Sequence, residues 1–175
     1  MIKKIILDCD PGHDDAVAIM LAAANKKIKI LGITCVGGNA TLENTQMNAL
    51  KICTLIRRTD IPIYAGEKNP INSELVTAGH VHGKSGLDIE GPPIEIEKNY
   101  KIQEMHAVDF IIKTSHEQND PIYLCPTGPL TNIAVALQKD PTIKKKIKQI
   151  VFMGGAGLCL GNITPSAEYN IYVDP

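Results

Sequence analysis

The chain has 175 residues, of which 44% are hydrophobic and 21% are charged, and its formal net charge is −1. This length fits one domain with a sizeable core, and the near-neutral charge offers no basic surface for nucleic acid. No apolar run is long enough to span a membrane, and Met1 leads directly into the first predicted strand without a signal peptide. The five cysteines are odd in number, form no CxxC pair and lie mostly in apolar patterns. We therefore expect free thiols in a cytoplasmic protein.

Apolar strand-like runs alternate with helical patterns along the chain, as they do in a parallel sheet wrapped by helices. In chain order, the predicted elements are a strand at 3–7, a helix at 14–24, a strand at 28–36, a helix at 42–58, a strand at 62–65, a helix at 105–115, a strand at 122–125, a helix at 130–138 and a strand at 149–153. Pro129 falls at the predicted start of the last helix, where its missing N–H costs little.

These elements predict a single α/β domain over residues 1–175, with a Rossmann-like open, mostly parallel sheet and helices on both faces. Residues 68–100 differ from the rest, because they are rich in Gly, Pro and charge and show little periodicity. A stretch of this length in a compact domain is usually functional or mobile. We therefore expect it to be an irregular, mobile loop region at the active site.

Four aspartates follow the first predicted strand within eight positions, in the segment IILDCDPGHDDA at 5–16. Open α/β sheets place their ligands at this end of a strand. The mutual repulsion of Asp8, Asp10, Asp14 and Asp15 is costly unless a cation offsets it, and their oxygens suit Ca²⁺ or Mg²⁺ rather than Zn²⁺. Helix capping explains Asp14 or Asp15 but not all four. The pattern therefore predicts a metal site.

The later strands also end in turns that hold Gly or short polar residues. These turns are Gly37-Gly38-Asn39, Pro126-Thr127-Gly128-Pro129 and Gly154-Gly155. Each is ordinary by itself, but carboxyl ends of parallel strands meet at one edge of a sheet, so together they predict the lip of a site.

Two further groups of polar residues admit both a functional and an ordinary explanation. Asn162, Glu168 and Asn170 suit recognition of sugar hydroxyls, although a polar loop with Asn in turns is the simpler explanation. His80 and His82 are too few for a metal site, and a surface histidine without a special role is the default. Their position within 68–100 favours a part in closing over a substrate.

Several motifs, taken together and in order, resemble the inosine–uridine-preferring nucleoside hydrolases. They are DCDPGHDDA at 8–16, GGN at 37–39, VHGKSGLD at 81–88, PTGPLTNIA at 126–134, and MGGA at 153–156 followed by GNITPSAEYNIYVDP at 161–175. The resemblance implies hydrolysis of a ribonucleoside to ribose and free base, as in nucleoside salvage, with Ca²⁺ in the site. It also implies a small-molecule substrate and a homo-oligomer.

The resemblance assigns roles to residues by position. Asp10, Asp15 and the main-chain carbonyl of Thr127 would ligate Ca²⁺, and Asp10 would also be the general base. Asn39 would support the water and the sugar, and His82 would lie on the loop that closes over the base; both are candidate catalytic and substrate-binding residues. The ribose hydroxyls would be held by Asp14, Asn162, Glu168 and Asn170. Asp8 would orient the metal ligands from behind.

Members of this family are longer than 175 residues, and their second half supplies another aspartate for Ca²⁺ and a His–Asp pair near the leaving base. We therefore expect these 175 residues to be the amino-terminal portion of a longer nucleoside hydrolase, with activity that depends on the missing groups. The overall similarity leans toward the bacterial pyrimidine-preferring members.

Two alternatives remain open at this point. Asp8-Cys9-Asp10 after the first strand also fits a Mg²⁺ phosphatase of the haloacid-dehalogenase type, although Pro11-Gly12 departs from that pattern. A module that binds ribose and Ca²⁺ without turnover is the other alternative.

Overall fold

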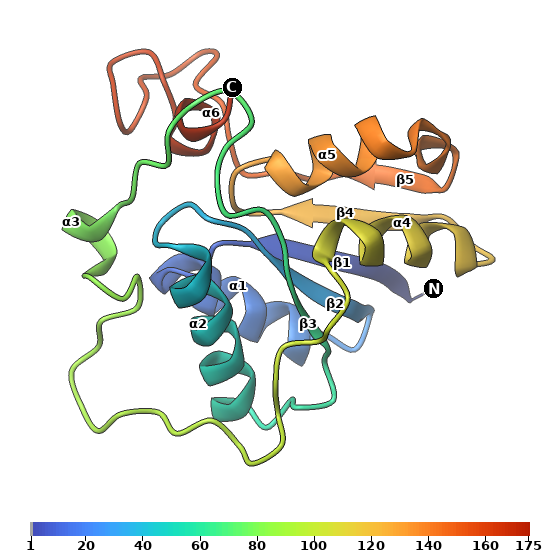
Figure 1. Ribbon diagram of the computed structural model, residues 1–175, viewed down its shortest axis with the longest axis horizontal. Helices are drawn as coiled ribbons and strands as arrows, with labels where there is room; N and C mark the ends of the chain where they lie inside the picture. The colour runs from blue at the N-terminus through green and yellow to red at the C-terminus, as the bar shows by residue number, and fades with distance from the viewer. Residues whose placement is uncertain (1) are drawn as a thin grey trace.

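The computed structural model describes residues 2–175, and its centre is one parallel sheet (Figure 1). Within these residues the sheet has five strands in the order β3-β2-β1-β4-β5. The strands are β1 (Lys3–Cys9), β2 (Ile28–Cys35), β3 (Ile63–Ala65), β4 (Ile122–Pro126) and β5 (Ile147–Ile150). All pairings are parallel, so the carboxyl ends of all five strands lie at the same edge of the sheet. The predicted α/β fold with an open parallel sheet is confirmed.

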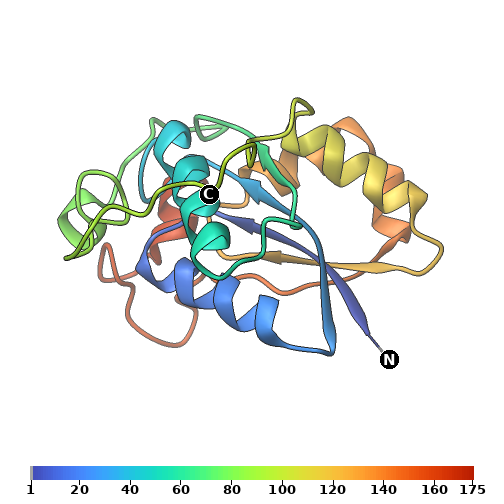
Figure 2. The same ribbon diagram turned by 90° about the horizontal axis from the view of Figure 1, so that it is seen from below.

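Helices cover both faces of this sheet, as Figures 1 and 2 show. The described helices are α1 (His13–Ala24), α2 (Leu42–Leu55), α3 (Gly79–His82), α4 (Ala107–Glu117), α5 (Thr131–Lys139), the 3₁₀ helix η1 (Pro141–Lys145) and α6 (Tyr169–Val173). Alternation along β1 directs Ile5 and Leu7 into the core shared with α1 and α2. Ile6, one position out of phase, packs into the core shared with α4 and α5.

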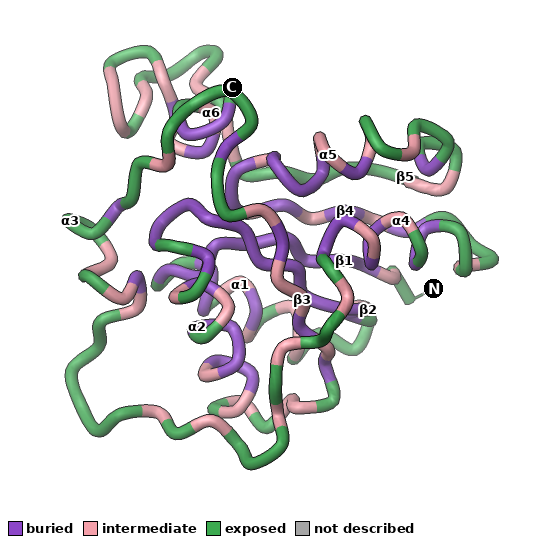
Figure 3. Tube along the Cα trace, viewed as in Figure 1, coloured by how far each residue is buried: buried purple, intermediate pink, exposed green. Residues whose placement is uncertain are grey.

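Burial is greatest in the middle of the sheet and least at the β5 edge, as the tube in Figure 3 shows. Ile150, Val151 and Phe152 are 37%, 52% and 50% exposed. β5 pairs with β4 on one side, and within residues 2–175 no strand pairs with its other side. In the described part of the chain, no helix has the length and apolar character needed to cross a membrane.

Most predicted elements are found within a few residues of their expected bounds, but several details differ. The last strand lies at 147–150 rather than 149–153, although Val151 and Met153 still donate backbone hydrogen bonds to β4. Pro129 precedes the cap of α5 instead of starting the helix, because Leu130 is the N-cap. Helices α3 and α6 were not predicted, since four or five residues are too short to show helical periodicity.

The cysteines are free thiols throughout the described residues, as expected. Cys9, Cys35 and Cys53 are buried in the sheet and α2, and Cys125 is half-buried. Cys159 is exposed, which departs from the apolar setting that most of the cysteines share.

Candidate functional site

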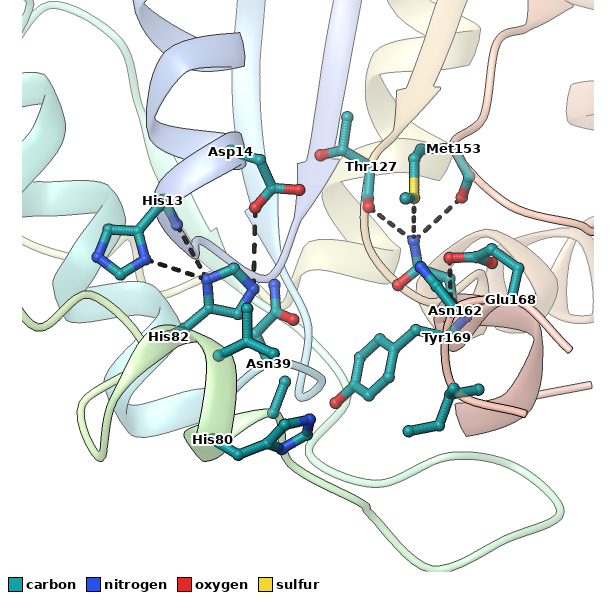
Figure 4. Close-up of a pocket in the computed structure, with 14 residues that line it drawn as sticks. His13, Asp14, Asn39, His80, His82, Thr127, Met153, Asn162, Glu168 and Tyr169 are labelled. Atoms are coloured by element: carbon teal, nitrogen blue, oxygen red, sulfur yellow. Dashed lines mark hydrogen bonds and ion pairs between the residues drawn. The ribbon is translucent and has the colours of Figure 1, made fainter. Parts of the chain in front are cut away.

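A cavity of about 480 Å³ opens at the carboxyl edge of the sheet (Figure 4). Its lining comes from the start of α1, from the turns after β2 and β4, from α3 and its N-cap, and from the segment between β5 and α6 together with the start of α6. The lining residues are His13, Asp14, Asn39, Ala78, His80, Val81, His82, Thr127, Met153, Asn162, Ile163, Glu168, Tyr169 and Asn170. The predicted lip is therefore present, and seven of the predicted site residues line it.

Asp10 does not line this cavity but is hydrogen-bonded to the lining residue Asn39, and it is completely buried. Its Oδ2 accepts a hydrogen bond from the backbone N–H of Asn39 at 2.6 Å. Its Oδ1 has no hydrogen-bond partner among the described residues. A Cβ atom at Gly38 or Gly128 would collide with this carboxylate, so glycine at both positions allows the two turns to close around Asp10. The result is a carboxylate held rigidly with one oxygen free.

Asp15 reaches the same place from the first turn of α1. Its Oδ2 accepts from the backbone N–H of Gly12 at 3.1 Å, and its Oδ1 accepts from Thr127 Oγ1 at 2.6 Å. The side-chain amide of Asn39 lies 3.4 Å from the same Asp15 Oδ2 and 3.1 Å from the backbone carbonyl of Asp10. We refer to Asp10, Asp15, Asn39 and Thr127 as the floor of the pocket.

Burial has a strong electrostatic effect on the floor. It raises the pKa of Asp10 well above its ordinary value, and the charge of Asp15 raises it further. Burial also raises the pKa of Asp15 to about 6. Two buried carboxyl groups that repel each other are stabilised by a cation between them. The free Oδ1 of Asp10 supplies a ligand oxygen, so the donor set fits a hard divalent cation.

This donor set is small. No group of three or more His, Cys, Asp or Glu side chains within residues 2–175 is arranged to hold a metal. The third predicted ligand, the main-chain carbonyl of Thr127, is not a side chain, and it accepts a hydrogen bond from Asn170 Nδ2 at 2.8 Å. Any ion on the floor would therefore rest on two carboxylates and a carbonyl of this chain.

Asp8 is buried and, like Asp10 and Asp15, does not line the cavity. Its Oδ1 accepts hydrogen bonds from Thr34 Oγ1 at 2.5 Å and Asn132 Nδ2 at 2.8 Å. Burial raises its pKa to about 7. Its backbone carbonyl accepts from the N–H of Thr127 at 2.8 Å, which connects Asp8 to the floor through the main chain.

The predicted sugar-binding set comes together around α6. Glu168 is the N-cap of this helix, and its carboxylate accepts from the backbone N–H groups of Asn170, Ile171 and Gly155. Asn162 Oδ1 accepts from the N–H of Tyr169 at 2.7 Å. These hydrogen bonds hold the side chains of Asn162 and Glu168 at the cavity while their backbone partners stabilise a five-residue helix. The contacts agree with the turn-forming explanation of these two residues, and the sugar-binding explanation of the set stays a prediction.

His82 stands opposite this set, on α3. Its Nε2 lies 3.9 Å from Asp14 Oδ1, and the side chains of His82 and Asp14 are 12% and 70% exposed. Burial lowers the pKa of His82. We refer to residues 78–88 and 153–170 as the rim of the pocket.

Two rim contacts were not predicted from the sequence. His13 contacts His82, and the hydroxyl of Tyr169 lies 2.6 Å from the carbonyl of Val76 and 3.1 Å from that of Gly38. His13 lies within the aspartate motif, and its sequence context gives no sign of a distant partner. Tyr169 looks like an apolar position of a polar loop, and the positions that it contacts are distant in sequence.

Comparison with known proteins agrees with this geometry. The sequence model of the inosine-uridine preferring nucleoside hydrolase family matches residues 5–175. The chain belongs to this family. Over 173 residues it is 49% identical to the pyrimidine-specific ribonucleoside hydrolase RihB of Escherichia coli, a match that covers 99% of this chain and 54% of that protein.

Solved nucleoside hydrolases share the fold. A plant nucleoside hydrolase, PpNRh1, superimposes with a TM-score of 0.92 at 37% identity, over 100% of this chain and 55% of that one. A purine-preferring ribonucleoside hydrolase from Gardnerella vaginalis gives 0.91 at 37% identity, over 99% and 55%. This nucleoside hydrolase chain thus spans about half the length of the relatives that it matches. Membership of the family does not favour the phosphatase alternative.

Proposed function

We propose that this chain carries the chemistry of ribonucleoside N-ribohydrolysis, which releases ribose and a free base. The observation that carries the proposal is the buried carboxylate of Asp10, which has one oxygen free of hydrogen bonds and accepts from Asn39, a residue that lines a cavity with other amide and carboxylate groups. A base that is held rigidly next to a polar cavity suits activation of a water molecule. The names of the relatives agree with a ribonucleoside as substrate.

We propose Ca²⁺ as the cofactor, held by Asp10, Asp15 and the main-chain carbonyl of Thr127. The buried, mutually repelling carboxyl groups of the floor support a hard cation. When bound, such an ion would anchor sugar hydroxyls and make a nearby water more acidic.

In the proposed reaction the Asp10 carboxylate takes a proton from water. The water oxygen forms a bond to C1′ of the ribose, and the bond from C1′ to the base nitrogen breaks. The electron pair of that bond leaves with the base, whose nitrogen takes a proton from solvent, and Asp10 then returns its proton to solvent. The transition state carries positive charge on the ribose, and the carboxylates of Asp14 and Glu168 at the cavity would stabilise that charge.

The other site residues are assigned to positioning. We propose that Asp14, Asn162, Glu168 and Asn170 hold the ribose hydroxyls. Asn39 supports both the water and the sugar, consistent with its hydrogen bonds to Asp10 and Asp15. His82 covers the base from the rim, and Asp8 orients the Thr127 turn through its backbone carbonyl.

The test measures free ribose released from uridine and from inosine by the purified chain, with Ca²⁺ and with EDTA. Release that needs Ca²⁺ and is much weaker with 2′-deoxyuridine supports the proposal, because the deoxy sugar lacks a hydroxyl to hold. Phosphate release from a phosphomonoester without ribose release would contradict it. Calorimetry with Ca²⁺ and ribose identifies the remaining alternative, which is binding without turnover.

A further inference from the structure

The start of α1 is tied directly to the rim segment that carries His82 (Figure 4). The backbone N–H of His13 lies 3.3 Å from His82 Nδ1, and His13 Nδ1 lies 3.2 Å from the same atom. The other ring nitrogen of His13, Nε2, lies 2.9 Å from the backbone carbonyl of Asp88. One side chain therefore contacts both ends of the segment 82–88.

The direction of these hydrogen bonds determines how the His82 ring is set. A backbone N–H can only donate, so Nδ1 of His82 is the acceptor and its ring hydrogen sits on Nε2. The two imidazole rings are stacked, with centroids 5.4 Å apart and planes at 28°. On the other side, a Cβ atom at Gly12 would come within 2.8 Å of the His82 ring. The ring is thus confined between Gly12 and His13.

This placement sets Nε2 of His82 3.9 Å from Asp14 Oδ1, which is within ion-pair distance but beyond hydrogen-bond distance. The side chain of Asp14 is 70% exposed, so its carboxylate stays accessible beside the His82 ring.

A second anchor holds the same segment from the opposite side. The buried side-chain amide of Asn48 donates to the carbonyl of Ser85 at 2.8 Å and to that of Pro11 at 3.1 Å. Within the segment, the Asp88 carboxylate accepts from the backbone N–H groups of Lys84 and Ser85. The turn at 84–88 is thus folded by its own contacts and by Asn48, whereas His82 depends on His13.

We propose that His13 is a positioning residue that fixes the ring of His82 at the rim, with Nε2–H directed toward the exposed carboxylate of Asp14 at the cavity. The proposal deepens the proposed function, on which its kinetic readout rests, but its structural readout does not depend on turnover. His13 itself need not touch the reacting atoms. Its side chain acts through His82 and through the carbonyl of Asp88.

The experiment compares His13→Phe, which keeps a stacking ring but removes both ring nitrogens, with His13→Gln, which keeps a side-chain donor. His116→Phe is the matched control. His116, in the last turn of α4, is also exposed, and its ring is hydrogen-bonded to the carboxylate of Asp140. The structural readouts are amide hydrogen exchange across 79–88 and the ring nitrogen signals of His82 at one fixed pH. Circular dichroism verifies that each variant folds.

We expect His13→Phe to speed exchange across 79–88 by about tenfold, the effect of one or two ordinary hydrogen bonds. The ring nitrogen signals of His82 should shift because the contact with His13 Nδ1 is lost, but the Nε2–H tautomer should remain, because the backbone N–H of residue 13 is present in every variant. We expect His13→Gln to lie between the parent and His13→Phe, and His116→Phe to match the parent. In a preparation that releases ribose at a measurable rate, His13→Phe should raise KM several-fold with little change in kcat.

Exchange and His82 signals in His13→Phe that match the parent would overturn the inference, whatever the turnover. An equal effect of His116→Phe would also overturn it. Absence of turnover in every variant would count against the proposed function alone, because exchange and ring signals would still decide the role of His13.

Discussion

The floor and the rim of the pocket are built in different ways. The floor consists of buried carboxyl groups enclosed by backbone N–H groups and close-packed glycines, and Asp10 has no exposed surface. The rim is partly exposed and is held by single side chains that reach across long stretches of sequence, such as His13 and Tyr169. Rigidity at the floor suits groups that must hold charge and a proton, whereas a rim of isolated hydrogen bonds can move to admit a substrate.

The largest expected effect tests the chemical role of the floor. Asp10→Asn should lower ribose release by about 10³-fold or more, because it removes the general base while keeping the shape of the side chain. The fold should survive, since the replaced carboxyl group is one whose pKa burial already raises. Initial rates and thermal unfolding measure the two effects. Asp120→Asn, at an exposed position, is the control, and equal rates in parent and Asp10→Asn would remove Asp10 as the base.

The floor is also the part of the site that the sequence made predictable. Asp10 and Asp15 lie five positions apart, on the end of a strand and the start of the next helix, so local pattern alone brings them together. The Gly38 and Gly128 turns belong to strands whose carboxyl ends meet at one edge in any parallel sheet. Periodicity predicted those strands, and the position of the aspartates at the end of the first strand then predicted a metal site there.

The rim was less predictable for a physical reason. The contact between His13 and His82 spans 69 positions, and that between Tyr169 and Gly38 spans 131. No periodicity in a single sequence reports which distant loops meet. The predicted bounds of the exposed edge strand β5 were two residues too late at the start and three too late at the end for a related reason. With few buried positions it lacks the alternation that marks a strand with one face in the core.

The second prediction tests the electrostatics behind the floor through pH. Asp8 titrates near 3.8 when unfolded and at about 7 when folded. Between these values the folded state holds a proton that the unfolded state has lost, so stability is present below pH 4 and is lost as pH rises to about 7. In EDTA, the free energy of unfolding should fall by up to about 1.4 kcal/mol per pH unit from this group.

Urea unfolding of the parent and of Asp8→Asn from pH 4 to 8 measures this loss. The variant should show a flatter profile, and the difference between the two isolates Asp8 from other carboxyl groups. Asp120→Asn should keep the slope of the parent. A parent that gains stability relative to Asp8→Asn as the pH rises would show that Asp8 is charged in the folded state.

The third prediction concerns the junction between floor and rim. Asn170 Nδ2 donates to the carbonyls of Thr127 at 2.8 Å and Met153 at 3.0 Å. Asn170→Ala leaves these partly buried carbonyls without that donor, which should lower the free energy of unfolding by about 1–3 kcal/mol. It should also lower ribose release, because the Thr127 carbonyl belongs to the floor. Asn119→Ala at an exposed position is the control. An unchanged unfolding midpoint in Asn170→Ala would show that the Asn170 hydrogen bonds do not stabilise the contact between the floor and the rim.

The smallest expected effect tests whether a rim contact matters to the floor at all. Tyr169→Phe removes only the hydroxyl that bridges the carbonyls of Val76 and Gly38, at a cost of about 1 kcal/mol in unfolding. Tyr172→Phe is a matched control on the same helix, because Tyr172 is exposed. If the Tyr169 hydroxyl only positions the rim and does not help to hold Asp10, Tyr169→Phe should change KM by a small factor and leave kcat near the parent value. A fall in kcat comparable to that of Asp10→Asn would show instead that the hydroxyl, through Gly38, helps to hold the catalytic carboxylate, and the distinction between floor and rim would fail at this residue.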